Sequence, residues 1–225
     1  MPRPMVDVLR TAASEAWYTA RAAGAVVPVW PLPPPHPGAD RPAVVLVHGF
    51  LGHDGMLRPL ARHLLDAGFP EVHRVRYPST RLALEDVVDR IAAVVKPLAA
   101  NGPVDLVGHS LGAVAARAFV KQYGGDAWVR RLVCLGGPHA GTALYRVVPP
   151  WLKPALDPRG PWVERLAEGP EPVPTTVIRA AYDHQVFPPR RGSIAGVNEV
   201  VVRHRGHNGL LWSLEAHLAV VAALS

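Results

Sequence analysis

Residues 104–112 have the sequence Val104-Asp105-Leu106-Val107-Gly108-His109-Ser110-Leu111-Gly112. The first four residues predict a buried strand, and residues 111–122 have a helical pattern. A Gly-x-Ser-x-Gly motif between a strand and a helix makes a sharp, strained turn that lifts the serine hydroxyl clear of the sheet. A side chain at Gly108 or Gly112 would collide with neighbouring chain at such a turn. We therefore take Ser110 as the candidate nucleophile.

Strand and helix patterns alternate on both sides of this motif. Apolar runs predict strands at 43–47, 72–77, 104–107, 131–135, 175–180 and 198–203, and helices are expected at 56–67, 84–100, 111–122 and 214–224. Strands that are apolar throughout and alternate with helices predict an α/β fold, with a mostly parallel central sheet and helices on both faces. Ligands bind such sheets beyond the carboxyl ends of the strands.

The first 42 residues differ in character from the rest. Residues 5–23 predict an amphipathic helix. Such a helix could contact a membrane or bind a partner, but we expect it to pack on the domain. Its apolar positions are Met5, Val8, Leu9, Ala12, Ala16 and Ala20, with Arg10, Glu15 and Arg21 mostly elsewhere. Seven prolines at 28–42 predict a stiff, extended connector. We expect residues 1–42 to form this helix and connector, and residues 43–225 to form one α/β domain.

The charge of the chain does not indicate a nucleic-acid partner. The formal net charge is +6, but all except three of the 24 basic residues are scattered arginines. No nucleic-acid recognition motif accompanies them. We expect no nucleic acid to bind, while peripheral contact with an anionic lipid surface stays open.

Cysteine content and apolar run lengths bear on the compartment. Cys134 is the only cysteine and lies in an apolar run, which favours a buried structural thiol. The N-terminus has no apolar signal-peptide region, and no run is long enough for a membrane span. We expect a cytoplasmic protein, although secretion stays open if a leader has been removed.

A second glycine-containing loop follows the first predicted strand. It has the sequence His48-Gly49-Phe50-Leu51-Gly52. Stabilising an oxyanion requires two backbone amides, one after the nucleophile and one from an early strand-to-helix loop. The amides of Leu111 and Phe50 are the candidates.

A serine nucleophile needs a histidine base and a carboxylate that orients it. Among the downstream carboxylates, Asp183 alone lies just past the end of a buried strand. His207 follows the last strand on a glycine-flanked loop, whereas His204 lies between arginines and His217 lies within the last helix. Asp183 and His207 therefore complete the predicted triad with Ser110.

Five segments together resemble the lipase and esterase branch of the α/β-hydrolase superfamily, especially bacterial triacylglycerol lipases. They are residues 45–52, 105–112, 135–142, 182–189 and 206–211, in the family's order. The resemblance implies an α/β-hydrolase domain, oxyanion amides at Phe50 and Leu111, and hydrolysis of acyl esters or lipids through an acyl-enzyme, without metal or cofactor. Two departures are Ala113, where the family often has glycine, and Gly137, where it often has threonine.

Residues 143–174 are where this fold usually inserts a cap. We expect a short apolar lid, with Leu51, Trp151 and Trp162 lining an acyl pocket for medium chains, although these tryptophans could simply pack in a proline-stiffened crossover.

Two other functions use the same scaffold. An acyltransferase or thioesterase would keep the triad, and an acyl-CoA substrate would favour a basic groove beside the pocket. A non-catalytic lipid-binding protein would have no need of an intact triad.

Overall fold

The computed structural model describes residues 4–24 and 41–225. Within these residues, six strands form one sheet in the order β2-β1-β3-β4-β5-β6, and every neighbouring pair is parallel. The strands are β1 (Val44–Val47), β2 (Val72–Arg74), β3 (Val104–His109), β4 (Val129–Leu135), β5 (Thr175–Ala180) and β6 (Asn198–Val202). The predicted parallel sheet is confirmed. β2 is shorter than expected, and as an edge strand it has only β1 to pair with.

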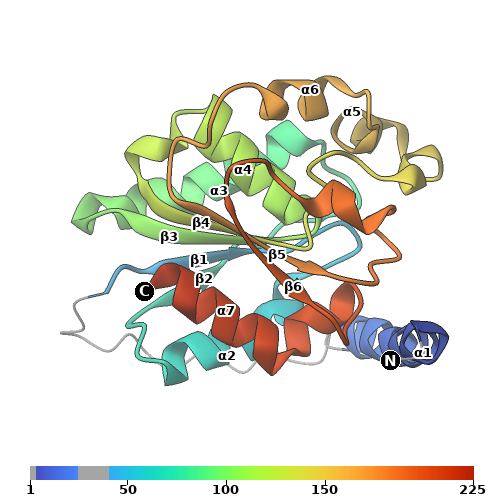
Figure 1. Cartoon of the computed structure of the whole chain (residues 1–225). Coiled ribbons are helices and arrows are strands. Elements are labelled where there is room, and N and C mark those ends of the chain that lie inside the picture. Colours follow the sequence, from blue (N-terminus) through green and yellow to red (C-terminus); the bar gives the residue numbers. More distant parts are fainter. Residues whose placement is uncertain (1–3, 25–40) are drawn as a thin grey trace.

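Helices cover both faces of this sheet, as Figure 1 shows. On one face lie α2 (Arg58–Asp66) and α7 (Leu214–Leu224), and on the other lie α3 (Leu84–Leu98), α4 (Leu111–Gln122) and, farther out, the short helices α5 (Lys153–Leu156) and α6 (Pro161–Ala167). The described part of the chain also contains 3₁₀ turns, namely η1 (Asp54–Leu57), η2 (Ala99–Asn101), η3 (Gly125–Ala127), η4 (Ala143–Arg146), η5 (Pro150–Leu152), η6 (Pro189–Gly192) and η7 (Asn208–Trp212).

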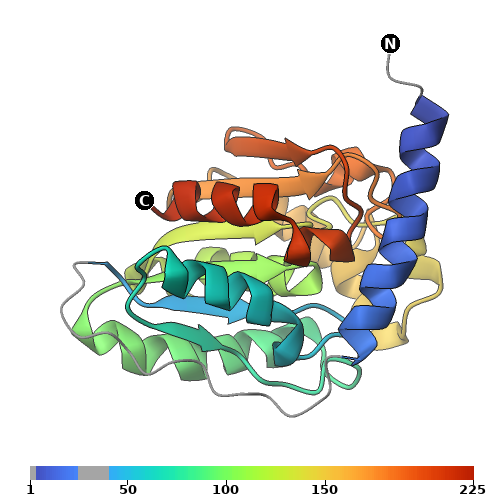
Figure 2. The ribbon, with the colours of Figure 1, turned by 90° about the horizontal axis from the view of Figure 1, so that it is seen from below.

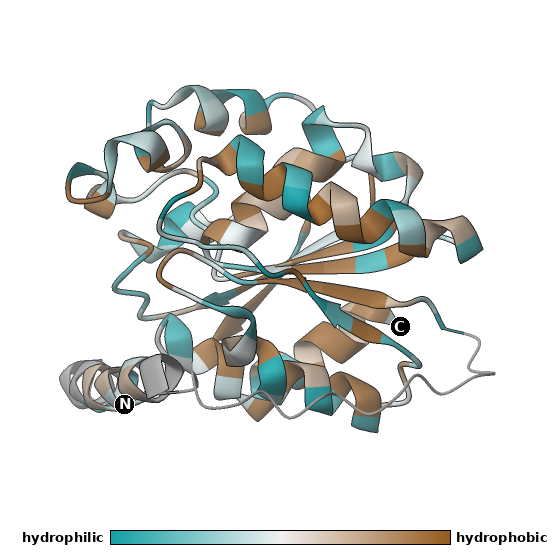
Figure 3. Ribbon diagram, turned by 180° about the vertical axis from the view of Figure 1, so that it is seen from behind, coloured by the Kyte–Doolittle hydropathy of each residue, from teal (hydrophilic) through white to brown (hydrophobic). Residues whose placement is uncertain are grey.

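The core is divided into two layers by the alternation of side chains along the strands. Val45 and Val47 pack with α3 and α4, whereas Val44 and Leu46 pack with α2 and α7. Successive side chains of a strand point to opposite faces, so a strand covered on both faces is apolar throughout. Figure 3 shows these hydrophobic strands between the two helical layers.

The N-terminal helix α1 (Pro4–Gly24) confirms the helix predicted at 5–23. Figure 2 shows it running past the edge of the sheet toward which the strand arrows point. The prediction of its packed face was wrong at the three alanines, while the side chains of Met5, Val8 and Leu9 lie outside the described part of the chain. Ala12, Ala16 and Ala20 are exposed, whereas Thr11 and Glu15 are buried. The reason is that Glu15 packs against polar loop backbone at η7, where a carboxylate can accept hydrogen bonds.

The predicted connector falls almost entirely on residues 25–40, outside the described part of the chain. In residues 4–24 and 41–225, no helix has the length and apolar character needed to cross a membrane. Cys134 is buried, as predicted, and burial raises the pKa of its thiol to about 12.

Candidate active site

Ser110 lies in the turn that joins β3 to α4. Its backbone has φ 57° and ψ −127°, a conformation that is costly for any residue with a side chain. In the described part of the chain, the only other residue besides glycine with positive φ is Leu51, in the loop after β1. The strained backbone is therefore concentrated in the two loops that were predicted to act on the substrate.

Close backbone contacts explain the glycines of the motif. A Cβ on Gly108 would lie 2.5 Å from the Ala113 Cα, and a Cβ on Gly112 would lie 2.6 Å from the Val47 carbonyl oxygen. Likewise, a Cβ on Gly49 would lie 2.6 Å from the Ser110 Cβ. The turn is held by backbone packing, as the sequence predicts.

His207 and Asp183 meet as a buried pair. Asp183 follows β5, and its Oδ2 accepts a hydrogen bond from His207 Nδ1 at 2.8 Å. The other carboxylate oxygen accepts hydrogen bonds from the amides of Gln185 and Val186, at 2.8 and 2.7 Å. His207 Nε2 has no hydrogen-bond partner within the described residues. The geometry thus fixes the tautomer of His207 and leaves its outer nitrogen free.

The electrostatic surroundings separate His207 from two nearby histidines. Burial lowers the pKa of His48 to about 4 and that of His109 to about 3, so both are neutral at pH 7. Burial also acts to lower the pKa of His207, but the Asp183 carboxylate more than offsets this and the pKa lies above its ordinary value. Burial acts to raise the pKa of Asp183, but His207 and the two amides hold it below its ordinary value.

The amides of Phe50 and Leu111 are available to a ligand. Neither donates a hydrogen bond to any residue of the described ranges. Leu111 begins α4, where the helix dipole favours negative charge. The loop that carries Phe50 is anchored at His48, whose ring stacks on Tyr77 with ring centres 4.0 Å apart.

Ser110 and His207 line one cavity of about 590 Å³. This volume lies within the range of small-molecule sites. Its walls are mostly apolar and are made by Thr19, Phe50, Leu51, Met56, Ser110, Leu111, Pro138, Thr142, Leu144, Val147, Val148, Leu156, Gln185, Val186, His207 and Asn208. Four of these residues come from the expected cap region at 143–174.

The three predicted pocket residues have different outcomes. Leu51 lines the cavity, but Trp151 and Trp162 do not. Trp162 is buried in the core, and its indole nitrogen donates a hydrogen bond to Glu85 at 3.0 Å. Trp151 is 45% exposed on the cap surface. The sequence placed both tryptophans in the right segment but could not show which way they face.

The two departures from the family pattern are linked in space. A Cβ on Gly137 would lie 2.8 Å from the Ala113 Cβ and 2.5 Å from His139 Nε2. The methyl group gained at position 113 therefore occupies room that a side chain at position 137 would need.

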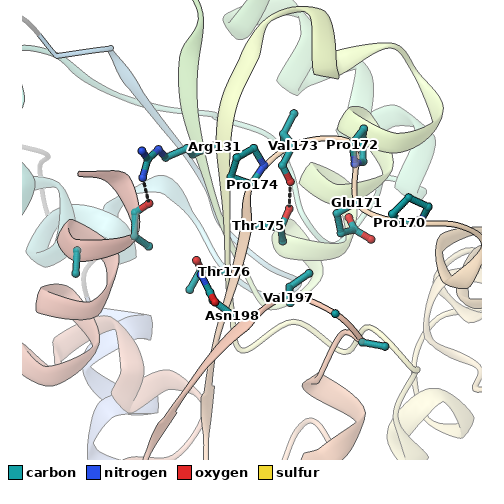
Figure 4. A pocket seen from close by; sticks show the side chains of 14 residues that line it. Arg131, Pro170, Glu171, Pro172, Val173, Pro174, Thr175, Thr176, Val197 and Asn198 are labelled. Carbon is teal, nitrogen blue, oxygen red and sulfur yellow. Dashed lines mark hydrogen bonds between the residues drawn. The ribbon is translucent and has the colours of Figure 1, made fainter.

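A second cavity, of about 570 Å³, lies at the opposite edge of the sheet (Figure 4). It is open at the amino ends of β5 and β6, near Thr175 and Asn198. It contains none of the predicted site residues, and ligands of such sheets bind at the other edge. The candidate active site is therefore the cavity at Ser110.

The sequence analysis did not predict that α1 contributes residues to the site. Thr19 lines the cavity, and the Glu15 carboxylate bonds to backbone amides next to His207. An isolated glutamate and threonine on an amphipathic helix carry no pattern that marks them as part of a site.

Comparison with known proteins finds a matching family. A family model described as palmitoyl protein thioesterase matches residues 43–183, a range that includes Ser110 and Asp183 and stops before His207. No curated protein matches the chain.

Solved structures of lipases and thioesterases share the fold. Bacillus licheniformis lipase BlEst2 in its mature form has a TM-score of 0.70 at 13% identity, covering 84% of this chain and 96% of that one. Aspergillus fumigatus lipase B has a TM-score of 0.65 at 19% identity over 82% of this chain, which spans only 52% of the lipase. The thioesterase domain from the curacin biosynthetic pathway has a TM-score of 0.60 at 17% identity, covering 83% and 92%.

Proposed function

The chain belongs to the palmitoyl protein thioesterase family of α/β-hydrolases, and on this premise we propose that it is a serine-dependent acyl hydrolase that cleaves carboxylic esters through an acyl-enzyme. The observation that supports this most directly is the shared cavity. A serine in a strained turn and a histidine paired with a buried aspartate line the same apolar space.

In the proposed mechanism, Ser110 Oγ attacks the ester carbonyl carbon while His207 Nε2 takes the hydroxyl proton. The amides of Phe50 and Leu111 stabilise the oxyanion, and each such donor typically contributes about 3–4 kcal/mol. His207 then gives its proton to the departing alcohol, which leaves Ser110 acylated. Water repeats these steps and releases the acid. Asp183 holds the imidazole tautomer and stabilises the imidazolium throughout.

The cavity favours an apolar acyl group. The side chains of Leu51 and Val147 are 74% and 81% exposed, so its mouth is apolar as well. Because burial of apolar surface contributes about 0.8 kcal/mol per methylene group, each added carbon that fits should strengthen binding.

A thioester substrate with an anionic leaving group is a second candidate, favoured by a basic groove. This groove of about 260 Å³ is lined by Arg146, Arg159 and Arg191, with Asp157 beside them. None of the three guanidinium groups forms a salt bridge with any residue of the described ranges. The turn η4 separates it from the acyl cavity, since Leu144 lines the cavity and Arg146 lines the groove.

The first experiment measures hydrolysis of p-nitrophenyl esters with short to long acyl chains by the wild type and Ser110→Ala. We expect the variant to lose at least about 10⁴-fold in kcat, because the nucleophile is removed. The chain-length optimum measures the usable depth of the cavity. A variant as active as the wild type would refute the serine mechanism.

The second candidate is tested with one acyl group on two thiols. Acyl-coenzyme A carries phosphates, whereas the same acyl thioester of N-acetylcysteamine carries none. If the groove binds the anionic part, Arg146→Gln with Arg159→Gln raises KM for the first substrate and leaves the second unchanged. Equal KM values for both substrates in the wild type would argue against this candidate.

A further inference from the structure

A carboxylate from α1 holds the loop that carries His207. Glu15 is buried, with 3% of its surface exposed. Its Oε1 accepts a hydrogen bond from the Asn208 amide, and its Oε2 accepts one from the Gly209 amide at 3.0 Å. Both amides follow His207 directly. Glu15 therefore fixes the peptide units next to the imidazole.

The loop and α1 fit each other closely. Asn208 Nδ2 donates a hydrogen bond to Thr19 Oγ1 at 3.0 Å. A Cβ on Gly206 would lie 2.6 Å from Glu15 Oε2, so a side chain there would displace the carboxylate. Glycine before His207 thus leaves room for Glu15.

The opposite side of His207 is held by the domain core. Its carbonyl oxygen lies 3.3 Å from His109 Nε2, and its Nδ1 donates to Asp183. His109 belongs to β3 and Asp183 follows β5, so both of these contacts are internal to the α/β domain. The contacts on the Asn208 and Gly209 amides come instead from a helix nearly 200 residues earlier in the chain.

We propose that Glu15 is a positioning residue for His207, and that α1 is therefore a component of the active site. This inference rests on the proposed function, in which His207 is the general base. Glu15 does not touch the reacting atoms. It holds the backbone after His207, so that the imidazole keeps its place in the wall of the cavity that Ser110 also lines.

The charge of Glu15 supplies a signature that a purely structural contact lacks. The titratable groups that act on His207 are Asp183 after β5, His109 on β3 and Glu15 on α1. Arg205, on the same loop, lies over the Tyr18 ring of α1. Burial acts to lower the pKa of His207, while Asp183 and then Glu15 raise it. Removing the Glu15 charge therefore lowers this pKa. Because the base acts when neutral, the acid limb of kcat/KM moves to lower pH.

The experiment compares the full-length wild type with Glu15→Gln. The amide side chain keeps the shape but turns one acceptor into a donor that faces a backbone N–H. Loss of a hydrogen bond to a charged acceptor should reduce kcat about tenfold to a hundredfold, with a smaller change in KM. The acid limb should move to lower pH.

Trp212→Leu is the matched control. The Trp212 ring of η7 stacks on Tyr18 of α1, so this variant loosens α1 but leaves Tyr18, with Arg205 over its ring, in place. We expect lower activity with an unmoved acid limb. The same pattern in Glu15→Gln would reduce Glu15 to an ordinary packing contact and overturn the proposal.

If Glu15→Gln does not fold, Glu15→Asp replaces it, with the charge kept and the hydrogen bonds lengthened. A large kcat loss with little pH shift is then expected, and wild-type kcat would overturn the proposal.

An NMR titration of the His207 ring separates this proposal from the proposed function. The signal is assigned with His207→Gln, and the measurement needs no turnover. If the wild type hydrolyses no ester or thioester, the proposed function fails, yet a lowered His207 pKa in Glu15→Gln still supports the placement of the carboxylate. An unchanged His207 pKa would overturn the placement whether or not the protein is active.

Discussion

Ser110 and His207 line the same cavity, but the chain holds them in different ways. The turn at Ser110 lies between β3 and α4, which are adjacent in sequence, and its two glycines pack closely against the backbone of Ala113 and of Val47 on β1. Ser110 has a strained backbone, with φ 57° and ψ −127°, whereas His207 has ordinary helical angles of φ −55° and ψ −58°. His207 is positioned instead by Asp183, His109 and Glu15, from three distant segments. A strained turn with close backbone packing positions the nucleophile, whereas hydrogen bonds from distant segments position the base.

Among the changes that test this comparison, Asp183→Asn should have the largest effect, because it breaks a long-range contact of His207. Asparagine can still accept from the amides of Gln185 and Val186, but it presents an N–H group to His207 and favours the wrong tautomer. We expect kcat/KM to fall about 10³–10⁴-fold while the protein stays folded. Steady-state kinetics measures kcat/KM, and circular dichroism shows whether the variant is folded. A loss below tenfold would mean that Asp183 does not orient the base.

Disturbing the backbone packing of the Ser110 turn with Gly112→Ala should act on stability. Alanine normally favours a helix over glycine, but here the new methyl group would lie 2.6 Å from the Val47 carbonyl oxygen. We expect urea denaturation to show a loss of about 1–3 kcal/mol in the free energy of unfolding. Gly169→Ala is the control for backbone strain without crowding, since no atom lies near its Cβ position. Equal stability of Gly112→Ala and the wild type would show that the turn can accommodate the added methyl group.

The smallest effect is expected from relieving the backbone strain at Ser110. Ser110→Gly should be more stable than Ser110→Ala by about 1 kcal/mol, because glycine adopts the strained conformation without steric cost. At His207 the order should reverse, and His207→Gly should be less stable than His207→Ala by about 0.5–1 kcal/mol. Thermal unfolding of the four variants gives both differences. The same order at both positions would contradict a local origin of the strain.

Much of the fold and of the site could be predicted from short stretches of sequence. The six strands and the four main domain helices were predicted within a few residues, because apolar strands between helical patterns require a parallel sheet covered on both faces. Ser110, Asp183 and His207 follow strand ends, and the carboxyl ends of parallel strands meet at one edge. Their convergence could therefore be predicted without knowing any distance.

Only the tertiary structure decided which side chains from the rest of the chain complete the cavity. Trp151 and Trp162 looked like pocket residues because they are large and apolar, yet one is exposed and the other fills the core. Glu15 was expected away from the apolar face of the N-terminal helix, yet it is buried against two amides. Motif residues can be recognised from the strand, turn and helix patterns within a few positions of them, so the sequence alone identifies them. The role of Glu15 depends on where α1 docks, and that docking is set by partners that the local sequence does not contain.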